Sequence, residues 1–177
     1  IPMEQELSAW SSQMAAFHIP RWCELPDMDL YMDQVISQLD KYLAPMQSCS
    51  DEHFVTASMI NNYVKQQLLP APVKKRYSRV HMAHLVVICL LKQVLSIPEV
   101  KMLLCTCLTS RPESELPVGY DMFCAAQECS FGRVAKMAAQ QESAVHSRAD
   151  LAVDAAALAC AGKALAQKLI PAAQEQP

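Results

Sequence analysis

The chain has 177 residues, of which 52% are hydrophobic and 19% charged, with a formal net charge of −3 at pH 7. This much apolar material excludes a disordered chain and is enough for one large domain or two small ones. The longest apolar run, Leu85–Leu91, is far too short to span a bilayer, and the N-terminal IPMEQELSAW lacks the pattern of a signal peptide. We therefore expect a cytoplasmic protein that makes no membrane contact.

The charges are unevenly distributed along the chain. Between His53 and Pro98 there is no Asp or Glu, while six Lys and Arg residues lie in the same interval. All 18 acidic residues share the rest of the chain with only nine cations. Such a strong separation of basic from acidic residues indicates a binding surface for a charged partner more readily than a role in solubility.

The composition favours helices, because Ala, Leu, Met, Gln and Lys are common and there are only 3 glycines. Apolar residues spaced by three and four predict a first helix over 4–17. Prolines in HIPRWCELP (18–26) interrupt the pattern. Asp27 is the expected N-cap of a second helix that ends near Pro45. The apolar face of this second helix comprises Met32, Val35, Ile36, Leu39 and Leu43.

N-cap residues mark the next three helices. Thr56 begins a third helix that runs to about Gln67, where Pro70 and Pro72 prevent its continuation. Ser78 begins a fourth, which contains the long apolar run and is therefore expected to be buried on most sides. Ser96 begins a fifth, with Pro98 and Glu99 in its first turn.

Beyond the fifth helix, TSRPESELP (109–117) is the best candidate for a boundary. Two Ala-rich helices follow, at roughly 119–140 and 143–170. The expected organisation is an N-terminal helix over 1–20, a central domain over 21–108, a linker over 109–117 and a C-terminal helical region over 118–177.

The third helix separates into two faces on a helical wheel. Ser58, Asn61, Asn62 and Lys65 share one face, and apolar residues share the other. Asn can form two hydrogen bonds with an adenine edge, and Lys reaches guanine or a phosphate. The polar face suits a DNA groove, although an ordinary solvated helix surface has the same appearance.

The segment after this helix, LPAPVKKRYSR, is strongly basic. A helix, a short proline-rich excursion and a capped helix together describe a helix-turn-helix with a basic wing. Lys74, Lys75, Arg76 and Tyr77 would form the wing, and Arg79 would meet the DNA backbone at the start of the next helix. Cations in such a wing contact phosphates, while the helix before it reads bases.

This order resembles the DNA-binding domain of MerR-type regulators. The motifs that carry the resemblance are MINNYVKQQLLP (59–70), RYSRVHMAHL (76–85) and SIPEVKMLL (96–104). A closer resemblance is to the bacterial YkrK-like family, DUF1836, through RWCELPDMDLYMDQV (21–35) and LKQVLSIPEV (91–100) as well, over roughly residues 20–105. Its members are regarded as transcription factors with a MerR-like fold. The resemblance implies that residues 56–67 are the recognition helix and 70–77 the wing.

The sequence predicts no catalytic site, no cofactor site and no metal site. Cys105, Cys107, Cys124 and Cys129 lack the paired spacing of a structural zinc site, and we expect the cysteines to be reduced and mostly buried. His81 and His84 have no evident third ligand, and surface packing or a phosphate contact suits them better. There is no nucleophile elbow, phosphate-binding glycine loop or HExxH, so we do not expect an enzyme.

In the last helix, Leu151, Leu158 and Leu165 recur every seven residues. Such a stripe suits a paired helix in a homodimer, and packing against residues 119–140 is the alternative. Two-fold dimers also match palindromic half-sites on double-stranded DNA. No group of polar residues identifies a small-molecule effector.

The sequence as a whole predicts an all-α transcriptional regulator with a MerR-like winged module and a helical C-terminal region. The alternative is a protein-interaction module whose basic wing binds an acidic protein.

Overall fold

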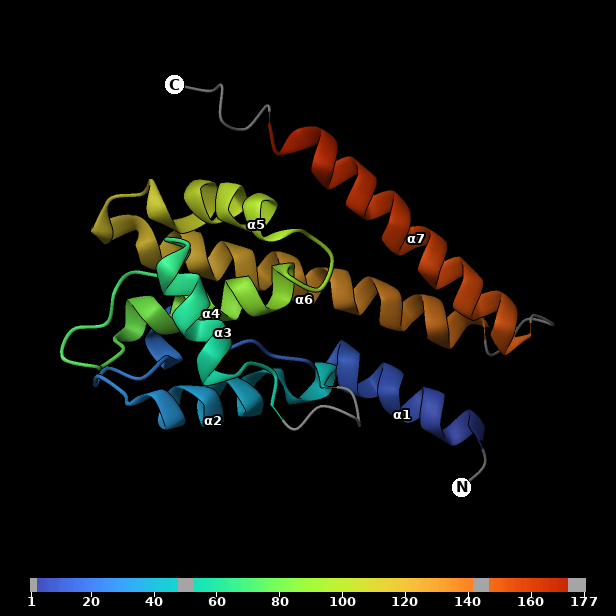
Figure 1. Cartoon of the computed structure of the whole chain (residues 1–177). Coiled ribbons are helices and arrows are strands. Elements are labelled where there is room, and N and C mark those ends of the chain that lie inside the picture. Colours follow the sequence, from blue (N-terminus) through green and yellow to red (C-terminus); the bar gives the residue numbers. More distant parts are fainter. Residues whose placement is uncertain (1–2, 48–52, 142–146, 172–177) are drawn as a thin grey trace.

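The computed structural model describes residues 3–47, 53–141 and 147–171 of the chain. These residues form an all-helical structure, as predicted (Figure 1). The extended pairings among them are two isolated β-bridges, Leu30 with Tyr77 and Val73 with Arg76. No helix in the described ranges is long and apolar enough to cross a membrane.

The centre of the fold is α4 (Arg79–Leu91), in which every residue from His81 to Leu90 is buried. Helices α2 (Met32–Leu43), α3 (Ala57–Lys65) and α5 (Ile97–Leu104) contribute side chains to the same core cluster. The prediction that the helix with the apolar run is buried on most sides is confirmed. An apolar surface on every side of a helix is what requires neighbours around it.

The three predicted N-caps are confirmed. Thr56 Oγ1 accepts the backbone N–H of Met59 at 3.3 Å. The Ser78 N–H donates to the His81 ring at 3.0 Å, and the Ser96 N–H donates to the Glu99 carboxylate at 2.8 Å. Each bond satisfies a backbone donor that the first turn of a helix would otherwise leave unpaired.

Helix α3 ends at Lys65, two residues before the predicted end. Gln67 takes a left-handed conformation with φ 59°, and the Leu68 N–H donates to the Tyr63 carbonyl at 2.9 Å. This pattern is a Schellman cap, a position that glycine usually fills. The absence of that glycine from the sequence explains the error.

The predicted N-cap of α2 at Asp27 is wrong, because α2 begins at Met32 with Tyr31 as its N-cap. The reason is a backbone pairing between two segments that are far apart in the sequence. Leu30 and Tyr77 exchange two hydrogen bonds of 2.9 Å, and this β-bridge holds the residues before α2 extended.

Helix α6 (Leu116–Gln141) joins the central core to the N-terminal helix α1 (Met3–Ala15). In its first half, Tyr120 and Cys124 are completely buried in the central core. Its second half packs along α1, where Ser11 Oγ donates to the Ala135 carbonyl at 2.8 Å. The helix therefore belongs to both parts of the molecule.

The predicted linker over 109–117 does not separate two packed units. Leu108 before it, Leu116 within it and Tyr120 after it belong to the same core cluster. Gly119 lies so close to Cys107 that a Cβ atom there would collide with the Cys107 carbonyl oxygen. A π-helical turn, Cys105–Thr109, carries the chain from α5 into this tight connection.

Carboxylates on α6 also fix the segment that follows α1. Glu128 accepts two hydrogen bonds from the Arg21 guanidinium, at 2.7 and 2.6 Å, and a third from the Ile19 N–H at 2.7 Å. Asp121 accepts the Trp22 N–H at 2.7 Å. Charge-assisted bonds of this kind are stronger than neutral ones and fix orientation as well.

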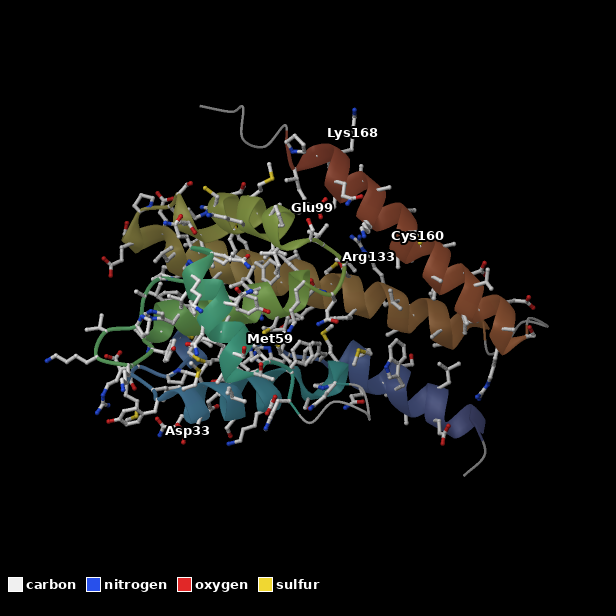
Figure 2. All side chains as sticks on the ribbon, viewed as in Figure 1. Asp33, Met59, Glu99, Arg133, Cys160 and Lys168 are labelled. Atoms are coloured by element: carbon white, nitrogen blue, oxygen red, sulfur yellow. The ribbon has the colours of Figure 1, made fainter. Side chains whose placement is uncertain are left out.

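Helix α7 (Arg148–Leu169) leaves the far end of α6 and returns toward α5 (Figure 1). Its predicted start near 143 falls outside the described residues. Its last turns rest on α5, where Gln167 Nε2 donates to Glu99 Oε1 at 2.7 Å and Ile170 is buried. Figure 2 shows Glu99 beneath this end of α7. Most of the α7 surface is exposed.

Candidate nucleic-acid interface

The predicted division of α3 into two faces is present in the structure. Ser58, Asn61, Asn62 and Lys65 are exposed, whereas Ile60 and Tyr63 are buried in the core. Thr56 fixes where the helix begins, and the Schellman cap fixes where it ends. The four polar side chains therefore stand on a rigid, anchored helix.

Within this face, the Asn62 amide oxygen accepts a hydrogen bond from Gln66 Nε2 at 3.2 Å. The end of α3 is further fixed by Lys101 of α5, whose Nζ donates to the Gln66 carbonyl at 3.1 Å. Lys101 adds an exposed cation at the end of α3 that the sequence reasoning did not include. Its position follows from the packing of α5 on α3, which no local pattern reports.

The basic segment between α3 and α4 forms a hairpin with a two-residue loop. Val73 and Arg76 pair through both of their backbone groups, at 3.2 and 2.9 Å. The loop residues Lys74 and Lys75 both have positive φ, 49° and 62°. These angles define a type I′ turn, which normally carries Asn or Gly because other side chains are strained there.

The two lysines at the hairpin tip are exposed, and no hydrogen bond or ion pair joins either of them to another described residue. A left-handed conformation costs about 1–2 kcal/mol for each residue with a Cβ atom. The chain thus holds two adjacent cations in strained positions at the tip of a projecting loop. The sequence predicted a basic wing here but not its two-residue turn.

The base of the hairpin is fixed by the segment before α2. Arg76 Nη2 donates to the Tyr31 hydroxyl at 2.7 Å, and its guanidinium lies over the Tyr31 ring, 4.4 Å from the centroid. Arg79 Nε donates to the Pro26 carbonyl at 3.3 Å. Sequence reasoning missed Tyr31, because its partner is 45 residues away and no local spacing reports the pair.

Tyr77 differs from the other predicted wing residues. Its side chain is only 3% exposed, so the expectation that it contacts DNA is wrong. Its backbone pairs with Leu30, and its ring packs edge-on against His81 with 5.5 Å between centroids. Tyr77 anchors the hairpin to the core.

His81 and His84 are buried, which corrects the expectation of surface packing or phosphate contacts. Burial lowers the pKa of both imidazoles below the usual value of 6.5. The His81 ring accepts the Ser78 N–H through Nδ1. A neutral imidazole that accepts at Nδ1 carries its proton on Nε2, so His81 supports the start of α4 in its uncharged form.

Lys92 is also committed within the fold. Its Nζ donates to the Phe54 carbonyl at 3.0 Å. The preceding loop is secured by Asp40, which accepts the Phe54 N–H at 2.8 Å and pairs with His53 at 2.7 Å. Lys92, one of the six cations in the acid-free interval, therefore stabilises the loop before α3 and does not belong to the exposed basic surface.

The cysteines were expected to be mostly buried, and that expectation is wrong. Cys89 and Cys124 are buried, and burial raises their pKa values to about 12 and about 11. Cys23, Cys129 and Cys160 are exposed. Within the described ranges no three His, Cys, Asp or Glu side chains are grouped so that they could hold a metal ion.

A family model described as a domain of unknown function, DUF1836, matches residues 20–123. This span contains α2 to α5, the hairpin and the start of α6 as far as residue 123, and it exceeds half of the chain. The protein belongs to the DUF1836 family, as the sequence motifs predicted. Comparison with curated proteins and with solved structures found no match.

Proposed function

We propose that the protein is a sequence-specific DNA-binding transcriptional regulator with a MerR-like winged-helix module. In this proposal α3 reads base edges, and the hairpin, as the wing, contacts phosphates. The observation that carries it is the pair of lysines, Lys74 and Lys75, in a turn that favours Asn and Gly. A strained backbone at an exposed tip suggests that the side chains are kept there for binding.

The position of the hairpin supports the same proposal. Arg76 stacks on Tyr31, and Tyr77 is buried, so the tip projects from a fixed base. A wing that holds its cations in place loses less conformational entropy when it meets a phosphate backbone. The absence of acidic residues from His53 to Pro98 removes a source of repulsion along this path.

The exposed face of α3 would supply the sequence discrimination. Asn61 and Asn62 are suited to adenine edges in a major groove, and Ser58 and Lys65 to neighbouring bases or phosphates. The helix is capped at both ends, which gives these side chains a defined direction. Base reading by a short, rigid helix is how helix-turn-helix proteins achieve specificity.

A homodimer would place two such modules on a palindromic site. Leu158 and Leu165 of the heptad stripe are 52% and 61% exposed, and Leu151 is half-buried. Exposed leucines repeated along one side of a helix are suited to a paired helix from a second copy. We include Leu158 and Leu165 in the proposal on this ground, whereas Leu151 faces α1 and α6.

One observation favours the alternative, a module that binds an acidic protein. Met28 and Val73, on the two chain segments next to the basic residues, are 67% and 68% exposed. Apolar side chains beside cations are common in protein interfaces. DNA binding remains the first proposal, because it accounts for the exposed polar face of α3 as well as for the basic hairpin.

The decisive variant is Lys74→Asn/Lys75→Gly, which replaces the strained lysines with the preferred residues of a type I′ turn. Removing two phosphate contacts should reduce the salt dependence of DNA binding by about two units of log K per log salt. The same change should raise the free energy of unfolding by about 1–2 kcal/mol. Binding to a random-sequence duplex pool at several salt concentrations measures the first effect, and urea denaturation the second.

A variant that is more stable yet binds DNA less well cannot owe its defect to unfolding. Unchanged DNA affinity and salt dependence would exclude the hairpin as the wing. Sequencing of the retained pool tests α3 separately: Asn61→Ala/Asn62→Ala should weaken the enriched motif, while Gln93→Ala, an exposed residue beyond α4, should leave it intact. Retention without an enriched motif would oppose sequence-specific regulation, and no retention at low salt would favour the protein partner.

A further inference from the structure

A cavity of about 300 Å³ lies between α1, α6 and α7. No residue of α3 or of the hairpin lines it. All the residues that line it fall outside the 20–123 family match. Figure 1 shows these three helices together at one end of the molecule. Its apolar walls include Leu7 and Trp10 of α1, Val134 and Met137 of α6, and Leu151 and Ala155 of α7.

The cavity exists because α7 is only partly supported. Its last turns are held on α5 through Gln167 and Ile170, but in its first half the side chains that face the cavity include the small Ala152 and Ala155. Farther along α7, a Cβ added at Gly162 would meet nothing within 4 Å. Ala138 is the only buried residue among the described ones that line the cavity, so the space is open to solvent and its apolar walls lack the packing contacts of a protein interior.

Charge defines what could enter this space. Among the described residues that line the cavity, Arg148 carries the only charge. No ion pair joins its guanidinium to another described residue. The nearby Asp150 does not line the cavity, and its carboxylate accepts hydrogen bonds from the Ser147 hydroxyl and N–H, at 2.7 and 3.1 Å. The charge of Arg148 is therefore available to a ligand.

We propose that this cavity binds a single-chain amphipathic carboxylate of the medium-chain fatty-acid type. The hydrocarbon chain would lie between Leu7, Met137 and Leu151, and the carboxylate would pair with Arg148. A guanidinium matches the two oxygens of a carboxylate, which favours this head group over an alcohol or an amine. The volume is at the lower end of the roughly 300–1,000 Å³ of ligand pockets, which favours one unbranched chain over a ring system.

Occupation would stabilise the first half of α7, because the chain supplies the packing that the helix lacks. Binding to the folded state alone increases the stability of that state, with the logarithm of the ligand concentration once this exceeds Kd. The inference does not depend on DNA binding, since no residue of α3 or the hairpin lines the cavity.

Trp10 makes the cavity directly observable, since it is a wall residue and the other tryptophan, Trp22, packs against Tyr120 in the central part of the fold. We expect decanoate to change the tryptophan fluorescence of the full chain in a saturable manner, and Trp10→Phe to abolish this change. Isothermal titration calorimetry should detect the same event in both proteins. Ala155→Leu, which fills the space, should prevent binding.

The head group is tested with decanol as the neutral probe and Arg148→Gln as the variant. Arg148→Gln should lower decanoate affinity about tenfold and leave decanol affinity unchanged, since a charge-assisted contact is worth at least that factor. Lys136→Gln is the matched control, because it removes a cation from α6 that does not line the cavity. Decanoate affinity should not change in it.

Three outcomes would overturn the proposal. The first is the absence of saturable decanoate binding below the concentration at which micelles form. The second is binding that Ala155→Leu leaves intact, which would place the ligand elsewhere. The third is equal loss of decanoate affinity in the Arg148 and Lys136 variants, which would reduce the effect to net charge.

Discussion

Helices α4 and α7 are both rich in apolar residues, yet their surroundings are opposite. In α4 every residue from His81 to Leu90 is buried, because three neighbouring helices cover it. In α7 the side chains of Val153, Leu158 and Leu165 are each more than half exposed. Apolar composition thus shows that a helix needs partners, but the number of elements the chain can place around it decides whether the need is met.

The largest expected effect separates the two helices by stability. Leu85→Ala in α4 should lower the free energy of unfolding by about 2–5 kcal/mol, because it leaves a cavity in a completely buried position. Leu158→Ala in α7 should change it by less than about 0.5 kcal/mol. Urea denaturation followed by circular dichroism measures both. A loss for Leu158→Ala that appears only at high protein concentration would indicate that a second copy covers α7.

A smaller effect tests how firmly α6, unlike α7, is attached. Glu128→Gln should cost about 1–3 kcal/mol, because a carboxamide cannot accept all three hydrogen bonds that Arg21 and Ile19 donate. Glu113→Gln is the control, since Glu113 is exposed in the connection before α6. Equal effects in the same denaturation assay would contradict a structural role for this contact.

The third prediction concerns acid and the two buried histidines of α4, His81 and His84. Burial lowers the pKa of His81 and His84 below 6.5, so the unfolded chain binds more protons than the folded one once the pH falls below that value. Their contribution to stability is complete above pH 6.5 and declines as the pH falls. Urea midpoints from neutral pH down to about pH 5, where carboxylates still stay ionised, measure it.

The control for this prediction is His84→Gln, which removes one of the two buried titrating groups. The slope of stability against pH should become shallower in this variant even if its stability at neutral pH is lower. An unchanged slope would mean that His84 does not titrate differently in the folded and unfolded states.

The smallest expected effect lies at the end of α3. Gln67→Gly should stabilise the protein by about 1 kcal/mol, because glycine adopts the observed φ of 59° without strain. Gln66→Gly next to it should not stabilise, since Gln66 has a φ of −85°. Thermal unfolding of the pair distinguishes relief of strain from a general effect of glycine.

Local signals in the sequence predicted most helices, because caps and apolar spacing act within one or two turns. Thr56, Ser78 and Ser96 each begin a helix as predicted, and the polar face of α3 is exposed. The errors come from interactions between distant residues. The pairing of Leu30 with Tyr77 moved the start of α2, and the burial of Tyr120 joined α6 to the central core across the predicted linker.

The candidate site shows the same division. The basic residues of the hairpin were visible in the sequence, but its two-residue turn was not, since Lys-Lys is not a turn signal. Tyr31 and Lys101 join the site only through tertiary packing. The cavity between α1, α6 and α7 had no sequence signal, because its walls come from three segments whose apolar residues look like ordinary core positions.

Gly119 has a consequence for how this family can diverge. Any side chain there would meet the backbone of Cys107, so the start of α6 and the π-helical turn can change only together. A relative that has another residue at this position must have rerouted the chain between α5 and α6. Residue 119 therefore serves as an evolutionary marker of whether a distant DUF1836 sequence keeps α6 joined to its core.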